Sequence, residues 1–320
     1  MGEKNFYSGF VSIIGKTNAG KSTLMNKLIG EKISIVSNKP QTTRNKILTV
    51  LTDDESQIIF LDTPGVHKPK SKLSKFMLKT VDQSLKEIDL ILFLVEPCGK
   101  ISDINQNIIE KLKKVSTPII LVINKIDTLQ NKEQKVSDIK NFYEQYGFKN
   151  ISSVSALTGE NLDELLNTIK KNLKPGPKYF DDDFLTDMPE RNIICEIIRE
   201  KILFFLKDEI PHGCAVEINF FKKRDKKDLI DIEASIFCEK ESHKKIIIGR
   251  DGNMLKKIGT QARLESENLL GSKLNLKLWV KVKKNWRNND FYLKQFGYDD
   301  KKSWWYVKFF PYILFLNRKY

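Results

Sequence analysis

The sequence predicts an α/β domain with a mainly parallel sheet, followed by a smaller α+β domain. From Gly9 to about Leu173, short apolar runs alternate with amphipathic stretches, which is the pattern of buried parallel strands joined by helices. The chain after residue 190 instead follows the order helix, strand, strand, helix, helix, strand. A length of 320 residues is enough for two hydrophobic cores of ordinary size.

Five apolar runs predict the strands of the first domain, because short runs without a polar face are typical of strands buried on both sides. They are residues 10–15, 57–62, 89–96, 118–125 and 150–156. Helical spacing of apolar residues is found at 21–30, 104–115 and 161–173. Since strands and helices alternate, we expect helices on both faces of the sheet.

An interdomain linker is predicted for residues 174–190. Residues that break regular structure and a run of acidic residues gather there: Pro175, Gly176, Pro177, Asp181, Asp182, Asp183 and Pro189. We therefore predict a first domain of residues 1–173 and a second domain of 191–300, with a tail of residues 301–320.

The second domain begins with a long helical pattern at 191–210, which Pro211 and Gly213 end. Two alternating segments then predict a β-hairpin with an exposed basic turn, and a helix–turn–helix and a last strand follow. These segments are residues 215–221, 229–239, 242–271 and 273–286.

The charge is concentrated at the C-terminal end of the chain. The net charge is +14, and residues 240–320 hold 19 basic and only 7 acidic residues. Such an excess favours a polyanionic partner, either nucleic acid or an anionic membrane surface, although a solvated basic surface is an equally open interpretation on charge alone. A composition of 40% hydrophobic and 30% charged residues excludes a disordered or fibrous protein.

The cysteines and the N-terminal segment predict a cytoplasmic location. The four cysteines form no CxxC pair, which is unlike a disulfide framework or a zinc site and fits a reducing compartment. The first residues lack the pattern of a signal peptide, and no run of 18 apolar residues is long enough to span a membrane. The three histidines are far apart, so we assign them no metal-binding or acid–base role.

Residues 15–22 match the phosphate-binding pattern GxxxxGK[ST], between a predicted strand and a predicted helix. Backbone N–H groups of such a loop bind phosphate at the N-terminus of the helix. We expect Lys21 to reach the β- and γ-phosphates as a catalytic residue, and the Ser22 hydroxyl to bind Mg²⁺. The candidate nucleotide-binding residues of this loop are Gly15, Lys16, Thr17, Asn18, Ala19, Gly20, Lys21, Ser22 and Thr23.

A second motif, Asp62-Thr63-Pro64-Gly65, follows the next predicted strand. A carboxylate at that position can hold Mg²⁺, usually through water, and the N–H of Gly65 can contact the γ-phosphate. The loop of residues 35–47, called switch I below, contains Thr42 and Thr43. A hydroxyl of this loop can close on Mg²⁺ only when the γ-phosphate is present.

Asn124-Lys125-Ile126-Asp127 predicts selectivity for guanine. The carboxylate of Asp127 can accept hydrogen bonds from N1–H and from the exocyclic amine of guanine, a pair of donors that adenine lacks. The motif therefore disfavours an ATP-dependent kinase, and the intact site residues disfavour an RNA-binding protein with a degenerate nucleotide site. Three further candidates for contact with the base are Ser155, Ala156 and Leu157.

Residues 249–252 form a GxxG sequence between two predicted helices in the basic segment. In a KH domain, a loop of this kind clamps the backbone of about four nucleotides of RNA. Glycines allow the backbone to approach the phosphates, and neighbouring lysines add charge. The candidate RNA-binding residues are Lys244, Lys245, Gly249, Arg250, Asp251, Gly252, Lys256, Lys257, Lys281 and Lys283.

The motifs GKTNAGKST, KPQTTR, DTPGVHKP, NKID and SAL occur in the order found in the Era family, which the chain resembles over residues 5 to about 298. The resemblance implies a P-loop GTPase domain followed by a type II KH domain. It also implies that the protein binds small-subunit (16S) ribosomal RNA and assists assembly of the small ribosomal subunit. Separately, we expect a monomer.

The same resemblance assigns roles to single residues. It favours Thr43 over Thr42 as the switch I ligand of Mg²⁺, and it places Val66 where Ras-like proteins have a catalytic glutamine. Because valine cannot orient water, the backbone, a potassium ion or a partner must position the attacking water. Related GTPases bind K⁺ through an asparagine at the place of Asn18, so we expect hydrolysis to be stimulated by K⁺.

The tail of residues 301–320 departs from the family pattern, with Trp304 and Trp305 among basic residues. This composition suits an interfacial membrane contact, although it equally suits packing on the second domain or a poorly ordered tail. The alternative function is therefore a regulatory GTPase that is peripherally associated with the inner face of the cell membrane through its basic region and aromatic tail.

Overall fold

The structure, a computed structural model, describes residues 6–37, 39–224 and 228–299. The predicted tail therefore lies outside the described residues, and its proposed membrane contact stays a prediction. Within the described ranges, no helix combines the length and the apolar character needed to cross a bilayer.

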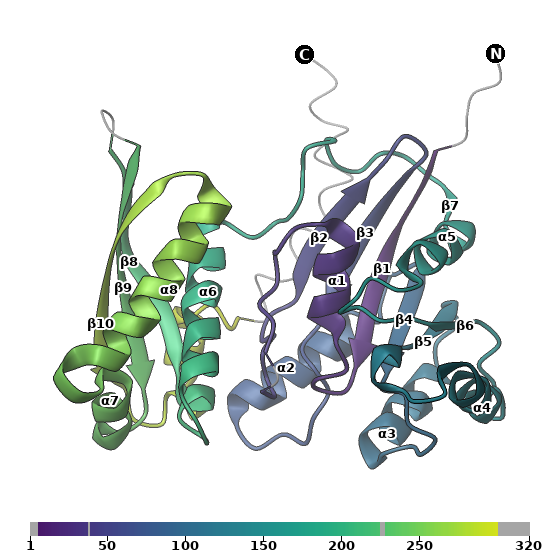
Figure 1. Cartoon of the computed structure of the whole chain (residues 1–320), viewed down its shortest axis with the longest axis horizontal. Helices are drawn as coiled ribbons and strands as arrows, with labels where there is room; N and C mark the ends of the chain where they lie inside the picture. The colour runs from purple at the N-terminus through teal and green to yellow at the C-terminus, as the bar shows by residue number, and fades with distance from the viewer. Residues whose placement is uncertain (1–5, 38, 225–227, 300–320) are drawn as a thin grey trace.

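The first domain contains a twisted sheet of order β2-β3-β1-β4-β5-β6, shown in Figure 1. Neighbouring strands pair in parallel except at β2, which is antiparallel to β3, and a two-residue strand, β7, adds an antiparallel pair to β1. The strands are β1 (Tyr7–Gly15), β2 (Ile47–Thr52), β3 (Ser56–Asp62), β4 (Leu90–Val95), β5 (Ile119–Ile123), β6 (Ile151–Ser153) and β7 (Lys174–Pro175). All five predicted strands are present, whereas β2 was not predicted.

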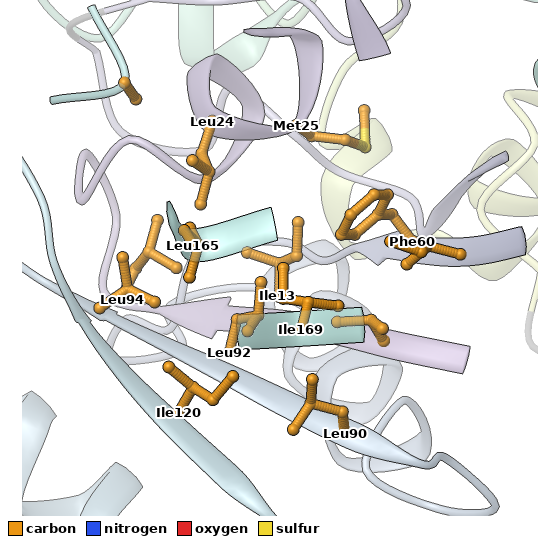
Figure 2. Close-up of a cluster of buried hydrophobic side chains, with 14 of the residues drawn as sticks. Ile13, Leu24, Met25, Phe60, Leu90, Leu92, Leu94, Ile120, Leu165 and Ile169 are labelled. Carbon is orange, nitrogen blue, oxygen red and sulfur yellow. The ribbon is translucent and has the colours of Figure 1, made fainter. Parts of the chain in front are cut away.

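Strand β4 shows why the sheet is covered on both faces. Its alternate residues Leu90, Leu92 and Leu94 belong to one apolar cluster, which Figure 2 shows beneath Leu24 of α1 and near α5. Ile91 and the other alternate residues belong to a second cluster on the opposite face, against α3 and α4. The helices of this domain are α1 (Lys21–Ile29), α2 (Lys72–Gln83), α3 (Asp103–Leu112), α4 (Lys132–Glu144) and α5 (Leu162–Asn172).

The second domain has the predicted element order. Its sheet runs β10-β9-β8, with β8 and β9 antiparallel and β9 and β10 parallel, and helices α6, α7 and α8 share one apolar core with it. The elements are α6 (Glu190–Phe205), β8 (Ala215–Lys223), β9 (Leu229–Cys238), α7 (Glu241–Ile248), α8 (Asn253–Leu270), β10 (Lys273–Val282) and α9 (Asp290–Gln295).

The segment predicted as a linker packs along the outer edge of β2. The buried side chain of Gln57 accepts hydrogen bonds from the backbone N–H groups of Tyr179 (2.7 Å) and Phe180 (3.0 Å). Further along, the N–H of Val50 donates to the oxygen of Leu185 (2.9 Å), which extends the ladder beyond β2. A buried amide with all these partners holds the segment firmly on the first domain.

The two domains also touch directly. Leu73 and Met77 of α2 join an apolar cluster whose other buried members come from the second domain. Those members are Ala215, Phe237, Trp286, Leu293 and Tyr298. Beside this cluster, the N–H of Lys72 donates to Oδ1 of Asn288 (3.0 Å).

Candidate nucleotide site and RNA interface

The predicted phosphate loop connects β1 to α1, as its motif requires. Gly20 has φ of 96° and closes against Asn124, whose Nδ2 atom would lie 2.2 Å from a Cβ at position 20. Only glycine fits there, because a side chain would meet both the strained backbone and the amide. Asn18 also has a positive φ, of 66°, and lines the same pocket as Thr17, Ser22 and Thr23.

Lys21 is buried beneath this loop. Its Nζ atom donates hydrogen bonds to the backbone oxygens of Gly15 (3.2 Å) and Lys16 (3.0 Å). Burial lowers the pKa of Lys21 to about 8, although the nearby carboxylate of Asp62 acts in the opposite direction. A phosphate anion bound beside this buried ammonium group would stabilise its charged form, which has little contact with solvent.

Three hydroxyl groups and one carboxylate meet at the end of β3. Oδ2 of Asp62 accepts hydrogen bonds from Ser22 (2.7 Å) and Ser34 (3.2 Å), and Thr43 Oγ1 lies 2.8 Å from Ser22 Oγ. Oδ1 of Asp62 is buried without a hydrogen-bond partner among the described residues, and burial raises the pKa of this carboxyl group. Such a set of oxygen donors with an unsatisfied carboxylate oxygen fits Mg²⁺.

The two switch I threonines have different surroundings. Thr43 Oγ1 faces Ser22 and Asp62, whereas Thr42 Oγ1 donates to the backbone oxygen of Lys39 (2.7 Å) within the loop. The structure therefore brings Thr43, not Thr42, to the group of oxygen donors.

The second motif lies against the phosphate loop. A Cβ at Gly65 would be 2.7 Å from Cα of Thr17, so this position needs glycine for a close backbone approach. The N–H of Val66 donates to the oxygen of Gly15 (3.1 Å), and the Val66 side chain packs against the core. The Thr63 hydroxyl donates to the backbone oxygen of Ile13 (2.8 Å), and Pro64 is buried between Thr63 and Gly65.

Asn124 braces the predicted base-binding loops. Its Nδ2 atom donates to the oxygen of Ala19 (2.9 Å), and its Oδ1 atom accepts from the N–H of Ala156 (2.9 Å). The exposed Asp127 accepts a hydrogen bond of 2.5 Å from Ser155 Oγ, so its carboxylate is held at the rim of the site. The side chain of Leu157 is 73% exposed and is therefore accessible for contact with a bound nucleotide base.

Sequence reasoning missed two residues of this site. Glu96, at the end of β4, pairs with Lys125 (2.6 Å) and with Lys16, and so connects the base-binding loop to the phosphate loop. These two lysines lower the pKa of Glu96 against the opposing effect of burial. Its position after a parallel strand was a usable signal, whereas no sequence pattern indicated Ser34.

These elements enclose a pocket with about 560 Å³ of empty volume, partly open to solvent. Its walls are the phosphate loop, switch I, Gly65 and Lys125.

The GxxG residues form a tight turn between α7 and α8. Gly249, Asp251 and Gly252 all have positive φ, and a Cβ at Gly249 would lie 2.7 Å from that of Met254. Arg250 is 96% exposed on the turn. Of the predicted lysines, four flank the turn on α7 and α8: Lys244, Lys245, Lys256 and Lys257.

Lys281 and Lys283 are not part of this group. Their Nζ atoms lie over the rings of Phe237 (6.0 Å) and Tyr292 (5.1 Å). Phe237 belongs to the apolar cluster against α2, whereas Ile236 and Cys238 of the same strand face the helices. The two lysines therefore lie on the opposite face of the sheet from the GxxG turn, because strand residues alternate between faces.

Switch I inserts into the second domain immediately after Thr43. Arg44 is only 1% exposed, and it donates hydrogen bonds to the backbone oxygens of Cys214 (2.7 Å) and His212 (2.9 Å). Its guanidinium lies over the rings of Trp286 (5.8 Å) and Tyr298 (6.0 Å). A cation so fully surrounded fixes the end of switch I to the second domain.

Helix α6 holds the other half of switch I. The buried guanidinium of Arg199 donates to the backbone oxygens of Thr42 and Gln41. Glu200 accepts from the N–H of Val36 (2.9 Å). Neither Arg44 nor Arg199 was singled out from the sequence, because a contact across more than 150 residues leaves no local pattern.

Together, the phosphate loop, the guanine motif and the GxxG turn define a P-loop GTPase that carries a KH domain. Family models agree: residues 10–125 match the model described as 50S ribosome-binding GTPase, and residues 209–287 match the KH domain. The chain is 56% identical to the GTPase Era of Clostridioides difficile (strain 630) over 297 residues, which cover 92% of the chain and all of the relative. The chain belongs to the Era family of GTPases.

Another relative, the GTPase Era of Thermoanaerobacter sp. (strain X514), is 54% identical over 95% of the chain and 100% of its own length. Two crystal structures resemble the fold with a TM-score of 0.88 and 41% identity, over 92% of the chain and 99% of each structure. One is Era in complex with MgGDPNP and nucleotides 1506–1542 of 16S ribosomal RNA, and the other is a variant of Aquifex aeolicus Era bound to GDP·AlF4⁻.

Proposed function

We propose that this protein is a GTP-hydrolysing switch that binds small-subunit (16S) ribosomal RNA through its KH domain and assists assembly of the small ribosomal subunit. The observation that carries the proposal is the position of two adjacent residues of switch I. Thr43 faces the phosphate loop, while Arg44 is buried in the KH domain. A change at the nucleotide therefore has a direct path to the RNA-binding domain.

The residues at the site suit phosphoryl transfer from GTP to water. Lys21 and Gly65 both line the pocket. We expect Lys21 to stabilise charge on the β- and γ-phosphates and the N–H of Gly65 to contact the γ-phosphate. Ser22, Thr43 and Asp62 would hold Mg²⁺, which neutralises charge between the two phosphates when it is bound. Because Val66 packs against the core, the water must be oriented by other groups.

Potassium is the proposed second cation. Asn18 lines the pocket on the phosphate loop, where a side-chain oxygen can help to bind a monovalent cation beside the phosphates. We expect GTP turnover to be faster in K⁺ than in Na⁺ at equal ionic strength, and the difference to disappear in Asn18→Ala. Equal turnover of the wild-type chain in the two salts would refute this role.

The switch works through the hold of the KH domain on switch I. When Thr43 closes on Mg²⁺ and the γ-phosphate, the neighbouring backbone that Arg199 and Arg44 grip must take one position. After hydrolysis that constraint is lost, and the KH domain can be held differently. RNA affinity and nucleotide state are then coupled in both directions.

Crosslinking of the full chain to RNA, followed by sequencing, tests the proposal with a GTP analogue and with GDP. We expect enrichment of small-subunit rRNA with the analogue, and loss of that enrichment in Gly249→Asp and Arg250→Glu. Gly147→Asp is the matched control, because Gly147 also has a positive φ but lies in an open loop of the first domain. The proposal would be overturned if the enrichment of small-subunit rRNA were the same with both nucleotides and in both GxxG variants.

We also propose that the protein acts as a monomer in the cytoplasm, where small-subunit rRNA is assembled. Light scattering should give the mass of one chain. The membrane-associated alternative rests on the basic C-terminal region and on the aromatic tail of residues 301–320, and it gains no support from the described residues or from the relatives of the chain.

A further inference from the structure

The last turn of α6 ends in two phenylalanines with unequal burial. Phe204 is 75% exposed, the largest exposure among the large apolar side chains of the described residues. Its ring meets the ring of Phe205 edge-on, with centroids 5.0 Å apart. The Nζ atom of Lys257 lies over the same Phe205 ring, 4.5 Å from its centroid. Phe204 and Lys257 thus both contact Phe205, and the three residues are called the aromatic row below.

The aromatic row continues the surface around the GxxG turn. Lys257 is the fifth residue of α8, which begins directly after Gly252, so about 7 Å of helix separates the two. Lys256 and Arg250 are exposed on the same stretch. In Figure 1, α6 lies beside α8, on the side of the second domain that faces the first. A strand of RNA that leaves the GxxG turn toward α6 would therefore meet Phe204.

The chemistry of the row favours a nucleobase as the occupant. An exposed aromatic ring with cations beside it is the arrangement by which proteins bind single-stranded nucleic acids, because bases stack on the ring and phosphates pair with the cations. An apolar protein partner would instead have to bury several lysines without their solvent.

The same helix end is held by switch I. The Nζ atom of Lys39 donates hydrogen bonds to the backbone oxygens of Leu203 and Leu206, on either side of the two phenylalanines. These are the last carbonyl groups of α6, which otherwise lack partners within the helix. The orientation of the aromatic row is thus tied to the conformation of switch I.

We propose that Phe204 is a stacking position for a base of single-stranded RNA, next to the GxxG turn and linked to switch I through Lys39. The inference rests on the proposed RNA-binding function and adds a subsite to it. Because stacking is an apolar contact, Phe204 contributes affinity without adding to the number of phosphate contacts.

Fluorescence anisotropy tests this with the full chain, a GTP analogue and a single-stranded RNA of about eight nucleotides, twice the length that a KH loop clamps. The sequence is taken from the 3′ end of small-subunit rRNA. We expect Phe204→Ala to weaken binding about tenfold and Phe204→Trp to retain it. The slope of affinity against salt concentration should not change in Phe204→Ala, because no phosphate contact is lost. In Phe204→Trp, the fluorescence of the new indole should be quenched by the RNA.

Phe291→Ala is the matched control. Phe291 is 70% exposed and lies beside Tyr292, whose ring is under Lys283, so it reproduces the composition of the aromatic row away from the GxxG turn. We expect this variant to bind the short RNA within twofold of the wild-type chain.

The outcomes separate the inference from the function it rests on. If Phe204→Ala binds like the wild-type chain while Arg250→Glu loses affinity, the KH function stands and the stacking position is wrong. If Arg250→Glu and Gly249→Asp also bind normally, the RNA-binding function itself is wrong. If Phe204→Ala changes only self-association in light scattering, the row is a contact between copies, and the inference is overturned.

Discussion

The guanidinium of Arg44 donates a hydrogen bond of 2.7 Å to the backbone oxygen of Cys214, 170 residues further along the chain. Arg44 follows directly after Thr43, which faces the oxygen donors of the nucleotide site. Two consecutive side chains of one loop therefore reach two different domains.

Replacing Arg44 should uncouple the domains. Arg44→Met keeps much of the volume but removes the hydrogen bonds that the Arg44 guanidinium donates to the second domain. We expect the ratio of RNA affinities with a GTP analogue and with GDP to fall to about 1, and stability to drop by about 3 kcal/mol, because buried carbonyl groups lose their partner. Anisotropy and urea denaturation measure the two effects. Arg224→Met, which removes an exposed ion pair with Asp231, is the control, and an unchanged affinity ratio in Arg44→Met would contradict the coupling.

Removing the charge of Asp62 should weaken the binding of Mg²⁺. Asp62→Asn keeps the shape of the side chain but supplies no anionic oxygen to the group formed with Ser22 and Thr43. We expect the Mg²⁺ concentration for half-maximal GTP hydrolysis to rise about 10- to 100-fold, which is typical of groups that act on a metal through its first ligands. The exposed Asp138→Asn is the control, and the same Mg²⁺ requirement in both variants would refute the site.

A change at Asp127 should alter base selectivity rather than phosphate binding. The carboxylate, held by Ser155, is proposed to accept two hydrogen bonds from guanine. In Asp127→Asn, the new amide N–H group would face one of the guanine donors instead of accepting from it. We expect GTP affinity to fall by on the order of 10⁴ and affinity for xanthosine triphosphate, which has an oxygen at that position, to rise. Competition binding with the two nucleotides measures this change in base preference. Unaltered preference for GTP would show that Asp127 does not read the base.

Nucleotide binding should take up a proton in mildly alkaline solution. Burial holds the pKa of Lys21 at about 8, and a phosphate beside it would raise that pKa. Near pH 8.5 the lysine is largely neutral before binding and charged after it, so GDP affinity should decline as pH rises through 8. Calorimetry in buffers of different ionisation enthalpy detects the uptake, and Lys21→Met should abolish it.

The lowered pKa of Lys21 also predicts how the free energy of unfolding changes with pH. The folded pKa of Lys21 lies below its unfolded value of 10.5, so the unfolded chain binds more protons between about pH 8 and 10.5. The cost of burying Lys21 is therefore complete below pH 8 and decreases as pH rises through this window. Lys21→Met should remove that contribution from the dependence of unfolding free energy on pH. Identical pH profiles for the variant and the wild-type chain would be the contrary result.

Much of the nucleotide site was predictable from the sequence, because each motif is local and follows a buried strand. Asp62, Asn124 and the phosphate loop are brought together simply by the parallel sheet. Strand β2 was missed although its sequence ILTVLT is largely apolar, because two threonines interrupt the apolar residues and the strand follows switch I directly. The separation of Lys281 from the GxxG turn depends on which face of β10 it occupies, and that was not worked out from the spacing. Contacts such as Arg44 with Cys214 depend on how two domains dock, which no local pattern specifies.

The segment along the outer edge of β2 bears on how the first domain would behave alone. A chain shortened to residues 1–173 would expose the unpaired N–H of Val50 and the amide of Gln57, both of which are satisfied by residues 179–186. Open strand edges recruit other strands, so the shortened chain should aggregate, whereas one that ends at residue 188 should remain soluble. We therefore expect the boundary at which the two domains can be separated to lie beside Pro189.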